Sequence, residues 1–90
     1  MDKNTVMIDL SQLEAVADIH ELLRYKLGLP EYYGGNLDAL HDVLTSTSSL
    51  HLILFGTDDT YRCISEYLPK LQKVMEDSSA SNPNFSYELR

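Results

Sequence analysis

The first apolar stretch, residues 5–10, predicts a short strand. Its apolar side chains fall on both faces of an extended chain: Val6, Met7, Ile8 and Leu10. An apolar run without polar alternation is typical of a strand that is buried on both sides.

A helical period of apolar residues follows this strand. The apolar side chains recur at i, i+3, i+4 and i+8: Ile19, Leu22, Leu23 and Leu27. This spacing predicts an amphipathic helix with one buried side. Two starts are open, because Ser11 with Glu14 forms a capping-box pattern, whereas Asp18 could equally lead a helix that begins near Ala17. Gly28 is a helix-ending residue.

A loop and a second helix come next. Residues 31–35 hold two tyrosines and two glycines, and Asn36 is a good N-cap for the helix that they precede. Three leucines at i, i+3 and i+7 are expected to be buried: Leu37, Leu40 and Leu44. That rotation turns Asp38, His41 and Asp42 to the exposed side. The polar residues 45–49 end the helix.

The third helical stretch is less regular. Before it, Leu50–Phe55 reads as a strand, although His51 leaves open whether one of its faces is polar. Capping oxygens are expected from Asp58, Asp59 and Thr60. The apolar members of the helical stretch are Tyr61, Ile64, Leu68, Leu71 and Met75. Pro69 predicts either a kink or two separate helices, because proline removes a backbone donor.

The end of the chain completes a repeating order of elements. Residues 78–83 form a turn-rich exit, and Phe85, Tyr87 and Leu89 alternate as a final strand. The order β, α, α, β, α, β favours a small parallel sheet with helical crossovers. Ninety residues are the length of a single domain, so we assign residues 1–90 to one.

Charge and composition restrict the function classes. The net charge of −7 argues against a nucleic-acid binder and favours a basic partner. The single cysteine, Cys63, cannot form an internal disulfide and is interpreted as a small buried residue. No signal-peptide pattern opens the sequence, and the longest apolar run is too short to span a membrane, so we expect a cytoplasmic protein.

The acidic residues are concentrated in one part of the sequence. Residues 27–61 contain five carboxylates and no lysine or arginine. Asp38 and Asp42 stand four apart on one helical face, where like charges repel by roughly 0.2–0.5 kcal/mol. This repulsion suggests that an external cation neutralises the pair, although ordinary solvated carboxylates would give the same pattern. Tyr32 and Tyr33 beside the glycines suit a contact surface, and one of them could instead belong to the core.

The sequence of residues 29–45, LPEYYGGNLDALHDVLT, closely resembles the signature of the barstar family, the intracellular inhibitors of barnase-type ribonucleases. The resemblance implies a two-layer α/β fold: a three-stranded parallel sheet with three to four helices packed on it. It also implies a one-to-one complex with a ribonuclease, a monomeric free inhibitor, no catalytic activity and no cofactor. Immunity or antitoxin roles fit the same resemblance.

The resemblance also implies roles for individual residues. Asp42 would take the place of an RNA phosphate in the enzyme's active site, and Asp38 would be a second acidic anchor. Tyr32 would supply an aromatic contact. The loop would be shaped by Gly34 and Asn36, and Glu76 matches an acidic residue at the rim of the contact.

Two residues of the signature depart from the family pattern. His41 stands where barstar carries a tryptophan, so an aromatic contact is lost and the target enzyme could differ. Protonation of His41 could also make binding pH-sensitive. Gly35 replaces an acidic residue of barstar, which lowers the charge of the surface.

Other functions are open from the sequence. The histidine and aspartates of residues 38–42 could be read as a metal site, but the helix supplies at most two well-aimed ligands, so we assign no metal. An acid–base enzyme using Asp38, His41 or Glu31 would need a water-excluding pocket. An acidic adaptor for a basic protein other than a ribonuclease keeps the fold and changes the role. The remaining histidines, His20 and His51, are interpreted as a helix-surface residue and a strand residue.

Overall fold

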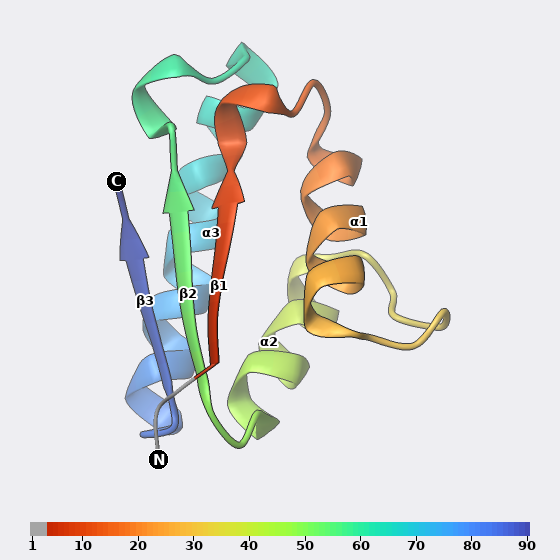
Figure 1. The fold of residues 1–90 in the computed structure, drawn as a ribbon, viewed down its shortest axis with the longest axis vertical. Helices are drawn as coiled ribbons and strands as arrows, with labels where there is room; N and C mark the ends of the chain where they lie inside the picture. Colours follow the sequence, from red (N-terminus) through yellow and green to blue (C-terminus); the bar gives the residue numbers. More distant parts are fainter. Residues whose placement is uncertain (1–3) are drawn as a thin grey trace.

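Three parallel strands form one sheet in the order β1–β2–β3, in a computed structural model that describes residues 4–90 (Figure 1). Along the chain the strands and helices are β1 (Asn4–Asp9), α1 (Val16–Leu27), α2 (Leu37–Ser46), β2 (Leu50–Phe55), α3 (Arg62–Ser81) and β3 (Phe85–Leu89). Two short 3-10 helices, Leu10–Gln12 and Thr57–Asp59, follow β1 and β2. The predicted α/β fold with a small parallel sheet is therefore confirmed.

The hydrophobic core lies between the sheet and the helices. In Figure 1, α3 runs behind the sheet, and α1 and α2 lie beside it toward the β1 side. Alternate residues of the central strand, Leu50, Leu52 and Leu54, are buried and face this layer of helices. Buried side chains from every helix complete the core: Ile19, Leu23, Leu40, Leu44, Ile64, Leu71 and Met75.

No helix of residues 4–90 covers the outer face of the sheet, so the expectation that β1 is buried on both sides is wrong. Thr5 is exposed, and the outward-facing Met7 keeps 43% of its surface exposed. The outward-facing Ile53 is nevertheless buried, because its strand is central and pairs it with Met7 on one side and Glu88 on the other. On a sheet face without a helix layer, only side chains of the central strand are shielded from solvent by their neighbours.

His51 lies on the same outer face, which answers whether this side of β2 is polar. Its Nδ1 is 2.7 Å from the Ser86 hydroxyl and its Nε2 is 4.0 Å from a Glu88 carboxylate oxygen. Glu88 also pairs with Arg90 at 2.6 Å. The outer face of the sheet therefore mixes apolar and charged side chains, and His51 is a strand residue as expected.

The free edge of β1 is partly covered by α1. β1 lies at the side of the sheet and pairs only with β2 within residues 4–90. The Lys26 ammonium donates a hydrogen bond to the Met7 carbonyl oxygen at 2.8 Å. The side chain of Lys26 thus satisfies a backbone acceptor that no neighbouring strand reaches.

Helix α1 is stabilised at its start by the Asp18 side chain and ends at Gly28. Its first residue is Val16, and the Asp18 carboxylate accepts hydrogen bonds from the backbone N–H groups of Glu14 and Ala15. Ser11 does not cap this helix, because it lies in the preceding 3-10 helix and bonds to the Asp9 carboxylate. Gly28 has a φ of 66°, the left-handed conformation that glycine adopts without strain.

Helix α3 is one continuous helix with Pro69 inside it, which resolves the two alternatives for this segment. The capping prediction for Asp58, Asp59 and Thr60 is wrong, because the two aspartates lie in the 3-10 helix and Tyr61 is the N-cap without a side-chain cap. As the N-cap, Tyr61 is exposed and is not part of the core.

The predicted turn at residues 78–83 is only partly correct. Helix α3 continues to Ser81, and Ser78 is fully buried. Asn82 follows the helix, and its side-chain amide donates to the carbonyl oxygens of Leu44 and Thr47 at 3.0 and 2.9 Å. The side chain of Asn82 therefore ties the end of α3 to the end of α2.

Candidate partner-binding face

Asn36 is the N-cap of helix α2 and helps to orient the candidate binding residues. The Asn36 backbone is extended, and its side-chain oxygen accepts a hydrogen bond from the Ala39 N–H at 2.8 Å. Leu40 and Leu44 are fully buried against the core, which fixes the rotation of the helix. The predicted N-cap and the predicted buried face are both confirmed, although Leu37 is only partly buried.

Replacing Asn36 with alanine is expected to lower the free energy of unfolding by about 1 kcal/mol, because one N–H of the first turn loses its acceptor. Asn36→Ser keeps a short side-chain acceptor and is the matched control, expected to stay near the parent value. Urea denaturation followed by circular dichroism measures both variants. Equal losses in the two would mean that the capping bond contributes nothing.

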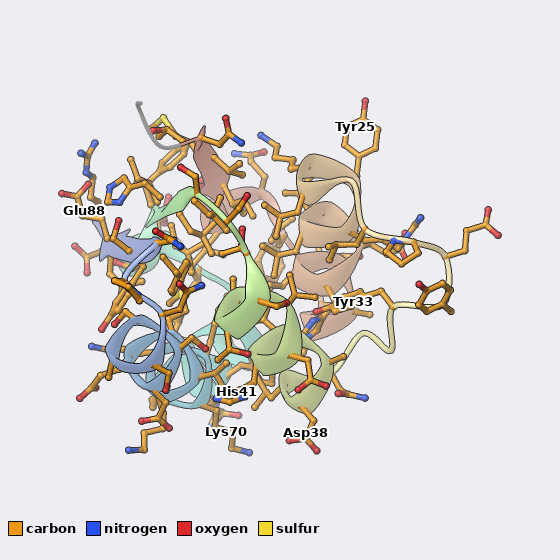
Figure 2. All side chains as sticks on the ribbon, turned by 90° about the horizontal axis from the view of Figure 1, so that it is seen from below. Tyr25, Tyr33, Asp38, His41, Lys70 and Glu88 are labelled. Atoms are coloured by element: carbon orange, nitrogen blue, oxygen red, sulfur yellow. The ribbon has the colours of Figure 1, made fainter. Side chains whose placement is uncertain are left out.

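The carboxylates of Asp38 and Asp42 face solvent from the opposite side of α2. Both side chains are exposed, and Figure 2 shows Asp38 pointing away from the helix. Neither forms a salt bridge with a cation among residues 4–90; the basic side chains that do form salt bridges there pair with other acids. Asp38 lies in the first turn, where the helix dipole favours a negative charge. Asp42 lies a turn further along the helix.

A small hollow brings the loop and the helix together beside Asp42. Its volume is about 230 Å³, and its walls include Pro30, Tyr32, Gly34 and Asp42. Tyr32 is 89% exposed, so one face of its ring is free for contact. The structure therefore places an aromatic ring and a carboxylate around one depression.

The loop conformation depends on its two glycines for different reasons. Gly35 has a φ of 64°, which favours glycine. A Cβ added to Gly34 would lie 3.2 Å from the Asn36 amide nitrogen and 3.4 Å from the Ala39 Cβ, so a larger residue there would press on the start of α2. Gly34 thus allows the loop to approach the helix closely.

Four other predicted contact residues do not line the hollow: Asn36 and Asp38 at the start of α2, and His41 and Glu76, which flank it. His41 is half-buried on α2, in contrast to the exposed aspartates beside it. Glu76 is exposed on α3, the helix that packs against α2. The predicted residues therefore divide into a compact group, which we call the acidic face (Tyr32, Gly34, Asn36, Asp38 and Asp42), and two flanking positions.

His20 was expected on the helix surface, and this expectation is wrong. Only 4% of its surface is exposed. Its Nδ1 lies 2.9 Å from the Tyr33 hydroxyl and its Nε2 lies 2.8 Å from the Tyr67 hydroxyl. Burial lowers the pKa of His20 and raises the pKa of Tyr67. The pKa of Tyr33 is raised to about 12 by burial and, secondarily, by the neighbouring Tyr67.

A sequence signal for the burial of His20 was present. His20, Leu23 and Leu27 stand at i, i+3 and i+7, so the imidazole widens the apolar stripe of α1. Tyr33 also proves to be the inward-facing tyrosine of the pair, and Figure 2 shows it pointing toward the interior. One member of the tyrosine pair is therefore tied into the structure and the other is available for contact.

Cys63 is exposed, so its interpretation as a buried residue is wrong. Ile64, Leu71 and Met75 define the buried side of α3, and Cys63 lies one residue, or about 100° of helix rotation, away from Ile64. Its thiol is 3.2 Å from the Glu14 carbonyl oxygen and donates to it.

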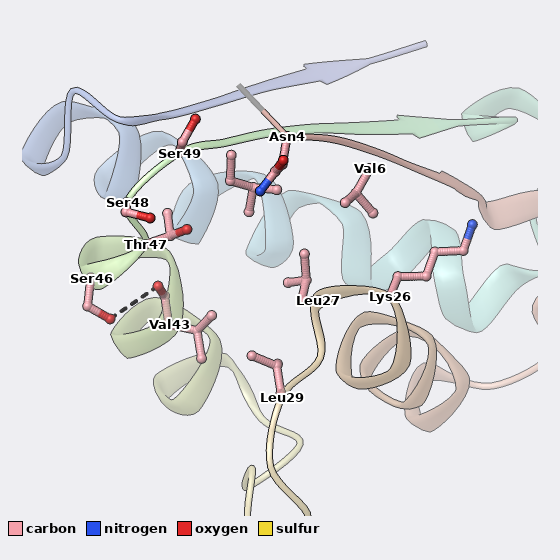
Figure 3. Close-up of a pocket in the computed structure, with 11 residues that line it drawn as sticks. Asn4, Val6, Lys26, Leu27, Leu29, Val43, Ser46, Thr47, Ser48 and Ser49 are labelled. Atoms are coloured by element: carbon pink, nitrogen blue, oxygen red, sulfur yellow. Dashed lines mark hydrogen bonds between the residues drawn. The ribbon is translucent and has the colours of Figure 1, made fainter. Parts of the chain in front are cut away.

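A larger groove of about 610 Å³ lies between the end of α1, the end of α2 and the start of β2 (Figure 3). Apolar side chains such as Leu27, Val43 and Leu50 line it together with the hydroxyl-bearing residues 46–49. Among residues 4–90, no carboxylate or imidazole lines this groove, so this part of the chain offers no pair of groups there for acid–base catalysis.

The described residues also limit metal and membrane interpretations. Within residues 4–90, no three side chains of the types His, Cys, Asp and Glu are grouped closely enough to hold a metal ion. None of the helices in this part of the chain is long and apolar enough to cross a membrane.

Two comparisons with known proteins agree on one family. The family model described as "Barstar (barnase inhibitor)" matches residues 3–88. A protein of Bacillus subtilis (strain 168), named "Putative ribonuclease inhibitor YrdF", is 45% identical over 77 residues, which cover 81% of this chain and 82% of the relative. The match to the family model spans the acidic face, α1 and α3.

Proposed function

The chain belongs to the barstar family, and we propose that it inhibits a barnase-type ribonuclease by inserting its acidic face into the enzyme's active site. The observation that carries the proposal is the pair Asp38 and Asp42, both exposed and without a cationic partner among residues 4–90. Barstar-family inhibitors are not enzymes, so the activity expected of this chain is binding and blocking.

Asp42 is proposed to stand in for the RNA phosphate. A carboxylate held where a phosphodiester would lie accepts charge-assisted hydrogen bonds from the arginine and lysine side chains of the enzyme. It offers no scissile bond, so the enzyme is occupied without turnover. Tyr32 supplies an adjacent aromatic contact at low entropic cost, because its ring has few rotatable bonds.

The other predicted residues support this contact at its margins. Asn36 and Gly34 are proposed to set the shape of the loop and to offer polar contacts, and Glu76 to meet basic groups at the rim. His41 replaces the family tryptophan, so less aromatic area is available to the partner, and we propose that this position adjusts the choice of target ribonuclease. The complex is proposed to be one-to-one and cytoplasmic, with a monomeric free inhibitor.

An inhibition titration tests the proposal directly. Purified protein is added in increasing amounts to a fixed concentration of a guanyl-preferring ribonuclease, and RNA cleavage is followed. Activity should fall linearly and end at one equivalent of inhibitor. Full cleavage at a large excess, across a panel of such ribonucleases, would contradict the proposal and favour an acidic adaptor for another basic protein.

Added salt is expected to slow association with the ribonuclease. The net charge of −7 attracts a basic enzyme over long distances, and this attraction is screened within about 10 Å at 0.1 M salt. Stopped-flow measurements should give an association rate constant that falls steadily with ionic strength, while the dissociation rate constant changes much less. An association rate constant that does not change with salt concentration would exclude electrostatic attraction as the cause of fast binding.

A further inference from the structure

The proposed contact does not use His20, yet both of the ring nitrogens of this buried histidine have partners. Tyr33 reaches it from the loop at 2.9 Å, and Tyr67 reaches it from α3 at 2.8 Å. The two rings contact the imidazole at centroid distances of 6.0 and 5.9 Å. Three separate segments, α1, the loop and α3, therefore meet at one buried side chain.

The loop has few other connections to the rest of the molecule. Among the hydrogen bonds of residues 4–90, the Tyr33–His20 bond is the only one from a side chain of residues 30–35 to another element. Two further bonds involve the backbone of this stretch: the Tyr33 N–H donates to the Pro30 carbonyl oxygen at 3.0 Å, and the Asn36 side-chain amide donates to the Gly34 carbonyl oxygen at 3.5 Å. Gly35 also lies close to His20, because a Cβ added to Gly35 would be 3.9 Å from the His20 Cβ. The position of the loop thus depends on His20.

We propose that His20 is a positioning residue for partner binding, which holds Tyr33 and thereby fixes Tyr32 and the hollow beside Asp42 in their binding arrangement. This inference rests on the proposed ribonuclease inhibition. His20 itself is buried and does not touch the partner, so it acts only through the loop.

The same geometry makes the loop sensitive to protonation. A neutral imidazole has one donor and one acceptor nitrogen, so one tyrosine hydroxyl accepts from the ring while the other donates to it. Protonation makes both nitrogens donors, and the tyrosine that donated must turn its proton away. The positive charge is also buried, which is costly unless a carboxylate pairs with it.

The groups around His20 do not offset that cost. Tyr33 from the loop and Tyr67 from α3 are neutral below their raised pKa values. On its own helix, Glu21 is paired with Arg24 at 3.1 Å, and the Asp18 carboxylate caps backbone N–H groups. Burial is accordingly the cause of the lowered pKa of His20.

The direction of the pH effect follows from that shift. The unfolded chain, or an opened loop, binds a proton at the ordinary His pKa of 6.5, above the folded value. The stabilisation that His20 provides is therefore complete above pH 6.5 and is lost as the pH falls below 6.5 toward the folded pKa. The closed loop should open preferentially in acid.

The test compares dissociation constants of the ribonuclease complex at about pH 7.5 and about pH 5.5, on either side of the ordinary histidine pKa. Tyr33→Phe removes only the hydroxyl that joins the loop to His20, and His20→Phe removes the titrating group. Both should bind about 2- to 10-fold more weakly than the parent at the higher pH, as expected for one lost hydrogen bond. Both should also weaken less than the parent on acidification.

His51→Gln is the matched control, because His51 lies on the outer face of the sheet, away from the loop. It should keep the parent ratio of the two dissociation constants, and titration of the ribonuclease itself is common to all variants. If His20→Phe and Tyr33→Phe keep the parent ratio as well, the role of His20 is overturned. If no variant and no parent protein binds a ribonuclease at either pH, both the inhibition and the role of His20 are overturned.

A measurement on the free protein separates positioning from general stability. The amide signals of residues 31–35 should shift in NMR spectra with the same midpoint as the His20 ring protons, below pH 6.5. Tyr33→Phe is expected to fold like the parent and to remove this coupling while His20 still titrates. If the chemical shifts of the loop amides in the parent do not change as His20 titrates, the proposal is overturned.

Discussion

Asp42→Ala is expected to weaken the complex with the target ribonuclease by roughly 150- to 5,000-fold, the equivalent of about 3–5 kcal/mol. The loss is large because the enzyme's cationic groups would be buried in the interface without their carboxylate. Asp42 is exposed in the free protein and forms no salt bridge within residues 4–90, so its removal leaves the inhibitor itself intact. Inhibition constants from RNA cleavage measure the effect.

Two further variants make the Asp42 experiment specific. Asp42→Asn keeps the size of the side chain and removes only its charge, so a loss close to that of Asp42→Ala would assign the effect to electrostatics. Asp58→Ala removes an exposed carboxylate from the 3-10 helix after β2, at the opposite end of the sheet from α2 (Figure 1), and should bind like the parent. Equal inhibition by Asp42→Ala, Asp58→Ala and the parent would show that the acidic face is assigned to the wrong residues.

The largest loss of stability outside the apolar core is expected for Asn82→Ala. Its buried side chain donates to the carbonyl oxygens of Leu44, in the last turn of α2, and Thr47, the C-cap of α2, and it accepts from the Asn84 N–H. Leaving the two carbonyl groups without donors should lower the free energy of unfolding by about 2–4 kcal/mol. Urea denaturation followed by far-ultraviolet circular dichroism measures the change.

Asn82→Asp tests the two donated hydrogen bonds of Asn82 separately from the one that it accepts. The carboxylate still accepts from the Asn84 N–H but cannot donate to the two carbonyl oxygens, so it should be at least as destabilised as Asn82→Ala. Asn84→Ala, at an exposed neighbour, should keep the parent stability. An unfolding midpoint unchanged in both Asn82 variants would mean that water replaces the side chain without loss.

The fold was predictable where local sequence and packing agree. Leu50–Phe55 is found with the predicted bounds, because its apolar run is short and lies between polar turns. The start and rotation of α2 follow from Asn36 and from the leucines at i+4 and i+8 after it. The acidic face was predictable for the same reason: once the leucines are buried, Asp38 and Asp42 must face solvent.

The errors come from properties that depend on neighbouring layers. Whether Met7 is covered depends on a second layer of helices, which the residues of β1 do not specify. His20 was misassigned because a buried histidine needs two polar partners, and these come from residues 13 and 47 positions away in the chain. The continuous α3 shows that packing of Leu71 and Met75 outweighs the local cost of Pro69.

The hydrogen bond from Lys26 to the Met7 carbonyl oxygen has a consequence for behaviour at high concentration. An uncovered strand at the side of a sheet can pair with a strand of another molecule. Such pairing with β1 would have to displace the Lys26 ammonium from the Met7 carbonyl oxygen or bury it without water, and either is unfavourable. An inhibitor must accumulate to at least the amount of its target. We therefore expect Lys26 to disfavour strand addition at the β1 side when the protein is abundant.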